Sequence, residues 1–121
     1  MIGRLHHVVV DCPDPGALAD FYSELLGLPV TYRTGGFAVV SRNDTSSGVA
    51  FQLAPEHQPP RWPDPDHPQQ FHLDVMVDDL EAAAPLVLAR GATRLQGHVY
   101  ADPAGHPFCL IPRPGWAEPI G

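Results

Sequence analysis

Polar and apolar side chains alternate along residues 4–11 (RLHHVVVD), a pattern typical of a β-strand with one buried face. The residues that follow predict an amphipathic helix, because Asp14 can cap its first turn and Pro15 suits the first helical position. Gly27 supplies the left-handed residue at which many helices end. Apolar side chains recur at the spacing of one helical face: Leu18, Phe21, Tyr22, Leu25 and Leu26.

Short strands complete the first half, which therefore reads β-α-β-β-β; they fit near residues 29–34, 36–42 and 48–54. The second half repeats this order. A strand over residues 70–77 leads into a helix that Asp78 caps, with Glu81 completing a capping box, and that Gly91 ends. Its apolar positions have the same spacing: Leu80, Ala83, Ala84, Val87 and Leu88. Its closing strands fit near residues 93–97, 98–101 and 106–112.

The two copies predict an α+β fold in a single domain, residues 1–121. Its parts are module one at about 1–54, a connector at about 55–69, module two at about 70–113 and a C-terminal tail at 114–121. Proline is dense in the connector, which favours an extended path. Trp62 within it either covers a ligand cavity or pins the connector onto its own domain.

Composition excludes several kinds of partner and chemistry. With 14 acidic residues against 7 basic ones, the chain should repel nucleic acid. It contains no lysine, which excludes Schiff-base catalysis. No apolar run reaches the roughly 18 residues of a membrane span, and no secretory signal pattern opens the sequence, so we expect a cytoplasmic protein without a membrane partner. Cys12 and Cys109 lack a CxxC context, which predicts two reduced thiols.

Strand alternation predicts which side chains face the helices and which face away from them. The residues expected to pack on the helices are Val8, Val10, Phe51, Leu53, Phe71, Leu73, Val75, Val77, Phe108 and Leu110. The opposite faces carry the candidate ligand contacts: His7, Val9, Gln52, His72, Asp74, Met76 and Cys109. Among these, we expect His7, Gln52, His72 and Cys109 to converge. Asp74 lies roughly 6 to 7 Å from His72 along the strand, where it either orients the imidazole or stays a solvated rim carboxylate.

Three segments resemble the vicinal oxygen chelate superfamily, which includes glyoxalase I, bleomycin-resistance proteins, fosfomycin-resistance enzymes and extradiol dioxygenases. They are HHVVVDCPDPGALADFYSELLGL, HLDVMVDDLEAA and DPAGHPFCLI, and their arrangement covers nearly the whole chain. The pattern is most similar to the small glyoxalase-like branch. The resemblance implies that the two modules curl their sheets into an incomplete barrel with the helices outside. It also implies a concave face that holds a divalent metal or a small organic molecule, and a homodimer.

The resemblance places the metal positions of the family's enzymes at His7, Gln52, His72 and Cys109. The family usually has glutamate at position 109 and often at 52, where it binds a hard cation and carries the substrate proton. An amide such as Gln52 cannot take a proton, and Cys109 would have to bind as a thiolate, which favours zinc. We therefore favour no metal cofactor, with zinc as the alternative. In a purely structural reading, Cys109 is an apolar filler and the two histidines form ordinary hydrogen bonds.

Three functions remain open at this point, and no catalytic residue is assigned. The favoured one is a small-molecule-binding protein with a metal-free cavity, covered by Trp62 or Trp116; sequestration of a toxic or antibiotic compound is one use of such cavities in the family. The alternative is a divalent-metal-dependent lyase, isomerase or group-transfer enzyme of the glyoxalase kind. The third is a partner-binding domain with a vestigial cavity. Unpaired sheet edges add to the expectation of a homodimer.

Overall fold

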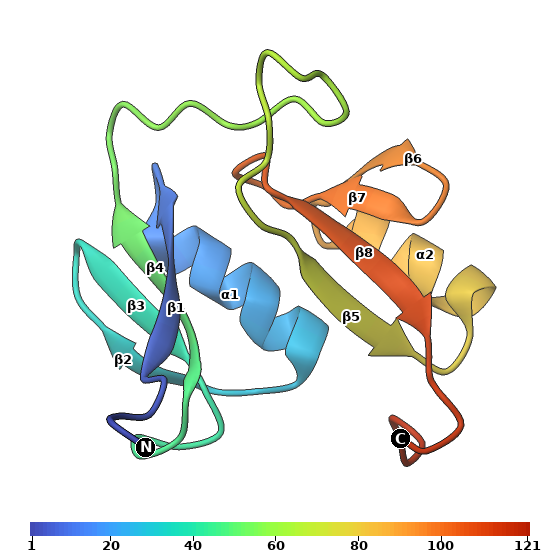
Figure 1. Ribbon diagram of the computed structural model, residues 1–121, viewed down its shortest axis with the longest axis horizontal. Helices are drawn as coiled ribbons and strands as arrows, with labels where there is room; N and C mark the ends of the chain where they lie inside the picture. Colours follow the sequence, from blue (N-terminus) through green and yellow to red (C-terminus); the bar gives the residue numbers. More distant parts are fainter. The chain divides into compact units, whose positions relative to one another are not determined.

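The computed structural model describes all residues, Met1–Gly121, and divides them into two compact units. The first unit comprises Met1–Gln58 and the second Pro59–Gly121. Each unit holds one helix and one four-stranded sheet in the order β-α-β-β-β, which confirms the predicted α+β fold of two repeated modules (Figure 1). Neither helix is both long and apolar enough to cross a lipid bilayer.

The elements of the first unit follow the predicted order. They are β1 (His7–Cys12), α1 (Pro15–Leu26), β2 (Val30–Arg33), β3 (Phe37–Val40) and β4 (Gly48–Leu53). The strand order in the sheet is β1-β4-β3-β2, with β1 parallel to β4 and the other pairs antiparallel. The first and last strands of the module are therefore hydrogen-bonded neighbours, although the helix and two strands separate them in sequence.

The sequence signals for α1 are confirmed in detail. Asp14 Oδ1 accepts a hydrogen bond from the Ala17 amide at 3.1 Å, Pro15 is the first helical residue, and Gly27 ends the helix with φ of 67°. One face of α1 is buried against the sheet, where the Tyr22 ring stacks on Phe51 with 5.3 Å between ring centroids. This stacking identifies the face of the sheet that α1 covers.

The second unit repeats the arrangement of the first. Its elements are β5 (Leu73–Val77), α2 (Leu80–Ala89), β6 (Thr93–Gln96), β7 (Val99–Ala101) and β8 (Pro107–Pro112). The strand order is β5-β8-β7-β6, again with the first strand parallel to the last. The core of this unit centres on Tyr100 and Phe108, which are fully buried and stack with 5.8 Å between ring centroids.

The predicted cap of the second helix is wrong by one residue. Asp79, not Asp78, is the N-cap: its Oδ1 accepts from the amides of Glu81 and Ala82 at 2.9 and 3.1 Å. The Asp78 carboxylate instead accepts hydrogen bonds from Arg113 Nε at 2.6 Å and from the Ile120 amide in the C-terminal tail. The hydrogen bond from Arg113 is the main reason why the pKa of Asp78 is lowered.

The buried face of α2 is narrower than the apolar spacing predicts. Only Val87 is buried, whereas Leu88, expected on the same stripe, is 41% exposed. Three residues of the expected strands also depart from the expected burial, since Val8 is 38% exposed and Leu53 and Phe71 are each 41% exposed. Leu53 is the last residue of β4 and Phe71 precedes β5, so neither is covered as a residue in mid-strand would be. The mid-strand expectations for Val75, Phe108 and Leu110 are confirmed.

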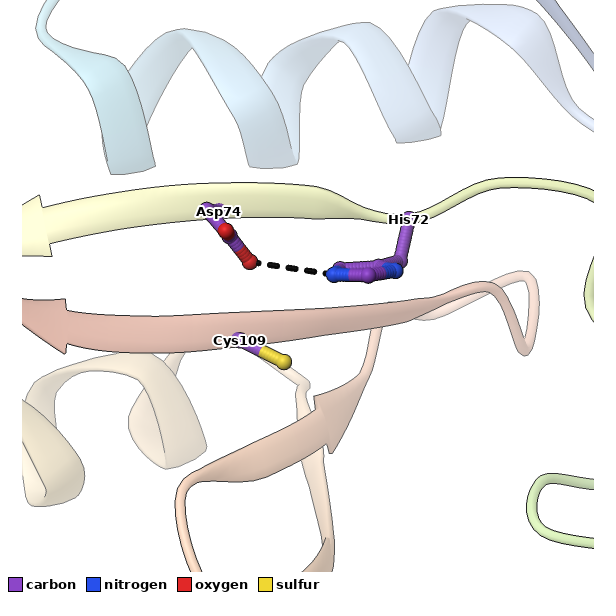
Figure 2. Close-up of side chains that lie close together, drawn as sticks. All are labelled: His72, Asp74 and Cys109. Atoms are coloured by element: carbon purple, nitrogen blue, oxygen red, sulfur yellow. Dashed lines mark ion pairs between the residues drawn. The ribbon is translucent and has the colours of Figure 1, made fainter.

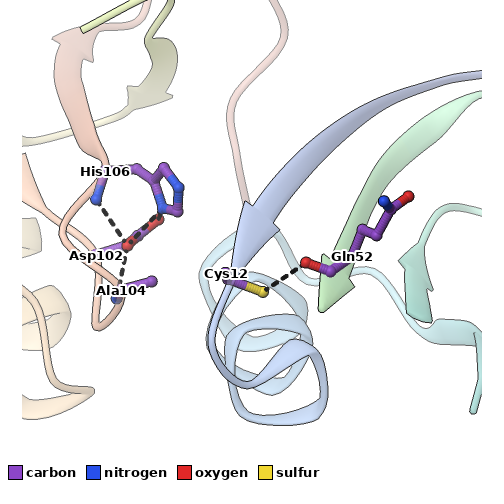
Figure 3. Close-up of polar contacts among 5 residues, drawn as sticks. All are labelled: Cys12, Gln52, Asp102, Ala104 and His106. Atoms are coloured by element: carbon purple, nitrogen blue, oxygen red, sulfur yellow. Dashed lines mark hydrogen bonds and ion pairs between the residues drawn. The ribbon is translucent and has the colours of Figure 1, made fainter. Parts of the chain in front are cut away.

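Polar groups near the strand ends are held by local hydrogen bonds (Figure 3). The buried Asp102 carboxylate accepts from the amides of Ala104 and His106 at 2.9 and 3.0 Å, and the His106 ring lies 3.2 Å away. These contacts close the predicted DPAGH turn. In the first unit, the Cys12 thiol donates to the Gln52 carbonyl at 3.7 Å. Neither cysteine forms a disulfide.

Gly48 should be intolerant of any side chain. A Cβ at this position would lie 2.2 Å from the Val40 carbonyl oxygen, a distance that backbone atoms cannot accept without moving apart. We expect Gly48→Ala to lower the free energy of unfolding by about 1–3 kcal/mol, the usual cost of overpacking, in urea denaturation. Gly36→Ala is the matched control, because the nearest atom to its Cβ is 3.9 Å away. Equal losses in the two variants would contradict this account.

Candidate functional site

An open pocket of about 550 Å³ lies on the first unit. It is lined by His6, His7, Val9, Thr31, Tyr32, Phe37, Val39, Ser41 and Asp44. The ladder pairs Val9 and Val39 with Ala50, which neighbours Phe51 along β4, so these two valines belong to the sheet face opposite α1. The pocket therefore uses the face that α1 leaves uncovered, and its floor is mostly apolar.

His7 lines this pocket, and a hydrogen bond from the backbone determines which of its ring nitrogens carries the proton. The Gly48 amide donates to His7 Nδ1 at 3.0 Å, so this nitrogen must carry a lone pair and the proton of the neutral ring sits on Nε2. Desolvation, followed by the nearby His6 ring, lowers the pKa of His7 below its ordinary value. The consequence is a neutral imidazole with its proton on Nε2.

Two hydroxyl groups supply the other polar feature of the pocket wall. Thr31 Oγ1 lies 2.7 Å from Ser41 Oγ, and Ser41 Oγ donates to the Asn43 carbonyl at 2.8 Å. Because the single proton of Ser41 is directed to Asn43, Thr31 donates to Ser41 and keeps its own lone pairs as acceptors. The pocket thus combines an apolar floor with polar side chains that include His7, Thr31 and the Asp44 carboxylate.

The strand register separates His7 from Gln52. In the parallel β1–β4 ladder His7 pairs with Gly48, whereas Gln52 pairs with Asp11, four residues further along. Four residues of strand span about 13 Å, and the side chains project from the sheet rather than along it. His7 and Gln52 are therefore not neighbours in the first unit, and Gln52 does not line the pocket.

In the second unit the structure brings His72, Asp74 and Cys109 together (Figure 2). Asp74 and Cys109 are direct partners in the parallel β5–β8 ladder, so their side chains leave the same face side by side. His72 precedes β5, and its Nε2 lies 3.1 Å from Asp74 Oδ1. One ligand atom from each of the three residues lies within 4.8 Å of the others.

The protonation of Cys109 follows from these neighbours. Partial burial raises the pKa of the thiol, and the Asp74 carboxylate raises it further by its charge and by accepting the S–H hydrogen bond. The protonated thiol is a weak nucleophile, since the thiolate is the reactive form. Cys109 is therefore not poised for covalent catalysis in this arrangement.

Of the remaining predicted contacts, only Val9 lines the first-unit pocket. Met76 is half-buried in β5 and does not line this pocket. Trp62 is half-buried in the connector and Trp116 is 81% exposed, and neither lines the first-unit pocket. Val9 does line it, at 47% exposure.

Sequence reasoning missed most of the pocket wall. The residues it did not single out are Thr31, Tyr32, Phe37, Val39 and Ser41. A signal was present, because alternation along residues 36–42 places Phe37, Val39 and Ser41 on one face of a strand. What the sequence could not show was that β3 and β2 lie on the far side of β4 from β1, so that these faces share one surface.

The residues that occupy the four metal positions of the family's enzymes are poorly suited to bind a metal ion. A histidine that binds a metal through Nε2 needs its proton on Nδ1, but His7 Nδ1 accepts the Gly48 amide proton. Gln52 is a neutral ligand about 13 Å along the ladder from His7, and the raised pKa of Cys109 disfavours its thiolate. The four positions offer no carboxylate for a hard cation such as magnesium or manganese.

The His7 assignment predicts a specific titration. In ¹⁵N-detected NMR we expect Nδ1 to show the shift of an unprotonated nitrogen and the ring to titrate with a midpoint below 6.5. A folded-state pKa below the unfolded value means that the unfolded chain takes up this proton first. The stability that His7 contributes is therefore present above pH 6.5 and is lost as pH falls through the folded pKa. His7→Gln should flatten this part of the stability profile, whereas an Nδ1–H tautomer would refute the assignment.

Comparisons with known proteins agree with this architecture. A glyoxalase/bleomycin resistance protein/dioxygenase family enzyme from Burkholderia phytofirmans PsJN superposes with a TM-score of 0.72 at 18% identity, covering 91% of this chain and 98% of that one. A glyoxalase-related enzyme from Fulvimarina pelagi gives 0.65 at 20% identity, with coverages of 96% and 92%. A glyoxalase/bleomycin resistance protein from Albidiferax ferrireducens T118 gives 0.63 at 15% identity, with coverages of 91% and 98%.

The sequence itself carries the family assignment. No curated protein sequence matches the chain. The family model described as a glyoxalase-like domain, however, matches residues 7–111, which include every strand and helix of both units except the last residue of β8. The chain therefore belongs to the glyoxalase-like domain family, within the vicinal oxygen chelate superfamily.

Proposed function

We propose that the protein binds a small organic molecule in the pocket of its first unit, without a metal ion in that pocket. The observation that carries the proposal is the pairing of an apolar floor with a neutral histidine donor. Val9, Phe37 and Val39 offer apolar surface, while the Gly48 amide keeps His7 in the Nε2–H form. Pockets of this kind bind ligands mainly by apolar burial and orient them with few polar groups.

The ligand chemistry follows from the polar groups of the pocket. His7 can donate, and the Thr31 hydroxyl and the Asp44 carboxylate can accept, so the pocket suits a largely apolar molecule that carries a carbonyl or ether oxygen and a hydroxyl or amide proton. The aromatic rings of Tyr32 and Phe37, 6.4 Å apart between centroids, offer edges and faces to a planar ligand. Two structural neighbours have names that include bleomycin resistance, and sequestration of a toxic or antibiotic compound is the role we propose.

Binding should depend on Val9 and not on its neighbour Val8. A ligand identified from a panel of planar apolar metabolites and antibiotics should lose affinity when Val9, which lines the pocket and is 47% exposed, becomes glutamine. Losing the burial of one valine costs about 1.5–2 kcal/mol, or roughly ten- to thirtyfold in Kd, measured by calorimetry. Val8→Gln is the matched control, because Val8 is similarly exposed at 38% but does not line the pocket. Equal effects of the two changes would place the ligand elsewhere.

We also propose that the protein is a homodimer. Each sheet ends in two edge strands, β1 and β2 in the first unit and β5 and β6 in the second, whose outer backbone groups lack a strand partner within the sheet. Pairing with a second copy would cover such edges, as closed symmetric oligomers do. Equilibrium ultracentrifugation at micromolar concentration should give twice the 13.1 kDa chain mass. A single species of the chain mass would refute the dimer.

A further inference from the structure

A second cavity adjoins the first-unit pocket and differs from it in character. This polar cavity, of about 360 Å³, is open to solvent and is lined by Arg4, Leu5, His6, Thr45 and Ser47. His6 lines both spaces, so the polar cavity continues the first-unit pocket. Four of the five lining residues carry polar side chains, whereas the floor of the pocket is mostly apolar. Together the two spaces suit a ligand with an apolar part and a polar end.

The parallel β1–β4 ladder brings the walls of the polar cavity together. His7 pairs with Gly48 in this ladder, so the residues just before each of the two strands also lie side by side. Ser47 Oγ donates to the Leu5 carbonyl and joins the two segments. The His6 ring lies 3.8 Å from the His7 ring between centroids, and the Gly48 amide holds His7. The fold itself therefore builds the cavity.

The hydroxyl groups of the polar cavity already have acceptors for their protons. Asn43 Oδ1 accepts from the amide and the hydroxyl of Thr45 at 3.0 and 2.8 Å, which fixes the loop before β4. The Ser47 proton goes to the Leu5 carbonyl. Both hydroxyl oxygens therefore keep lone pairs that can accept a hydrogen bond from a ligand.

Arg4 supplies the charge of the polar cavity. No hydrogen bond or ion pair joins its side chain to the rest of the chain, whereas Arg33 and Arg113 are paired with Asp20 and Asp78. No aspartate or glutamate lines the cavity. A guanidinium presents paired N–H donors in a plane, and this geometry matches the two oxygens of a carboxylate. The cavity therefore favours an anionic oxygen group.

We infer that the polar cavity binds a carboxylate carried by the ligand whose apolar part occupies the first-unit pocket, an inference that rests on the proposed function. The Arg4 guanidinium pairs with the carboxylate oxygens. The hydroxyl oxygens of Thr45 and Ser47 accept from a hydroxyl or N–H group beside the carboxylate. His6 lies where the two parts of the ligand join. The ligand class is therefore a planar, largely apolar carboxylic acid.

The charges of the two spaces place the carboxylate in the polar cavity. Asp44 lines the first-unit pocket and not the polar cavity, so its charge repels an anionic group from the pocket itself. One guanidinium balances one negative charge, which matches a carboxylate better than the nearly double charge of a phosphate monoester. The net charge of −7 on the whole chain adds to the cost of binding a dianion.

NMR titrations of the full chain with three probes test the assignment. Benzoate, benzamide and phenyl phosphate share one ring and differ in the charge of the attached group. Benzoate should shift the amides of His6 and Ser47 and the Arg4 Nε–H signal, and should bind at least about fivefold more tightly than benzamide. Raising the salt concentration to about 0.5 M should weaken the binding of benzoate and not that of benzamide. Equal affinities for these two probes, or tighter binding of phenyl phosphate than of benzoate, would overturn the inference.

Arg4→Gln and a matched control identify the cation. Arg4→Gln should reduce the affinity for benzoate to that for benzamide, and should leave benzamide binding unchanged. Arg42→Gln is the control, because it makes the same change in net charge and Arg42 lines neither space. It should keep the affinity for benzoate within about twofold of the parent. Equal losses in the two variants would show that net charge, and not the polar cavity, attracts the anion, and would overturn the inference.

The outcomes separate this inference from the proposed function. Benzamide should shift the amides of Val9 and Val39, and Val9→Gln should weaken its binding, because both valines line the pocket. Failure of both results would refute the pocket and not the carboxylate site. Absence of benzoate-induced shifts at Arg4 and His6, even at the tens of millimolar at which such small fragments bind, would overturn the carboxylate site whether or not the pocket binds benzamide.

Discussion

The parallel ladder between the first and last strand of each module is the constraint on which both candidate sites depend. Parallel strands cannot be joined by a tight turn, so each module needs a helix and an antiparallel hairpin between its first strand and its last. Once the two strands are adjacent, the register decides which side chains meet. It pairs His7 with Gly48 in the first unit and Asp74 with Cys109 in the second.

The same ladder gives the two units different chemistry. In the first unit the partner of the histidine is a glycine, whose amide occupies His7 Nδ1 and whose missing side chain allows close approach of Val40. The outcome is a neutral donor beside an apolar surface. In the second unit the registered partners are a carboxylate and a thiol, and a histidine completes the group. One repeated fold thus carries a mostly apolar pocket in one copy and the group of His72, Asp74 and Cys109 in the other.

The departure from the family's metal positions has a physical explanation in the donor types. Glutamate binds hard cations and moves protons, whereas Gln52 does neither as an amide and Cys109 has its proton held by Asp74. Membership of the glyoxalase-like family therefore defines the architecture and not the reaction. The side chains of each unit, and not the fold, determine which reactions or ligands are chemically possible.

The sequence by itself determined the elements and their faces. The Asp14 cap, Pro15 and Gly27 predicted the bounds of α1, and alternation placed Val75, Phe108 and Leu110 in the core. These features are local, because caps and alternating faces depend on residues within one turn or one strand. Where two adjacent residues of one type were available, the sequence prediction was wrong: Asp79 caps α2, whereas Asp78 accepts hydrogen bonds from the distant Arg113 and Ile120.

Tertiary structure alone decided how the faces combine. Alternation put Asp74 and His72 on one face, but pairing with Cys109 required the β5–β8 register, which no local pattern encodes. The pocket wall likewise required β3 to lie next to β4, so that Phe37 and Val39 join the surface that carries Val9. The tautomer of His7 depended on an amide 41 residues away in the chain. Such contacts bring together residues that are distant in sequence, and only the packed sheet fixes them.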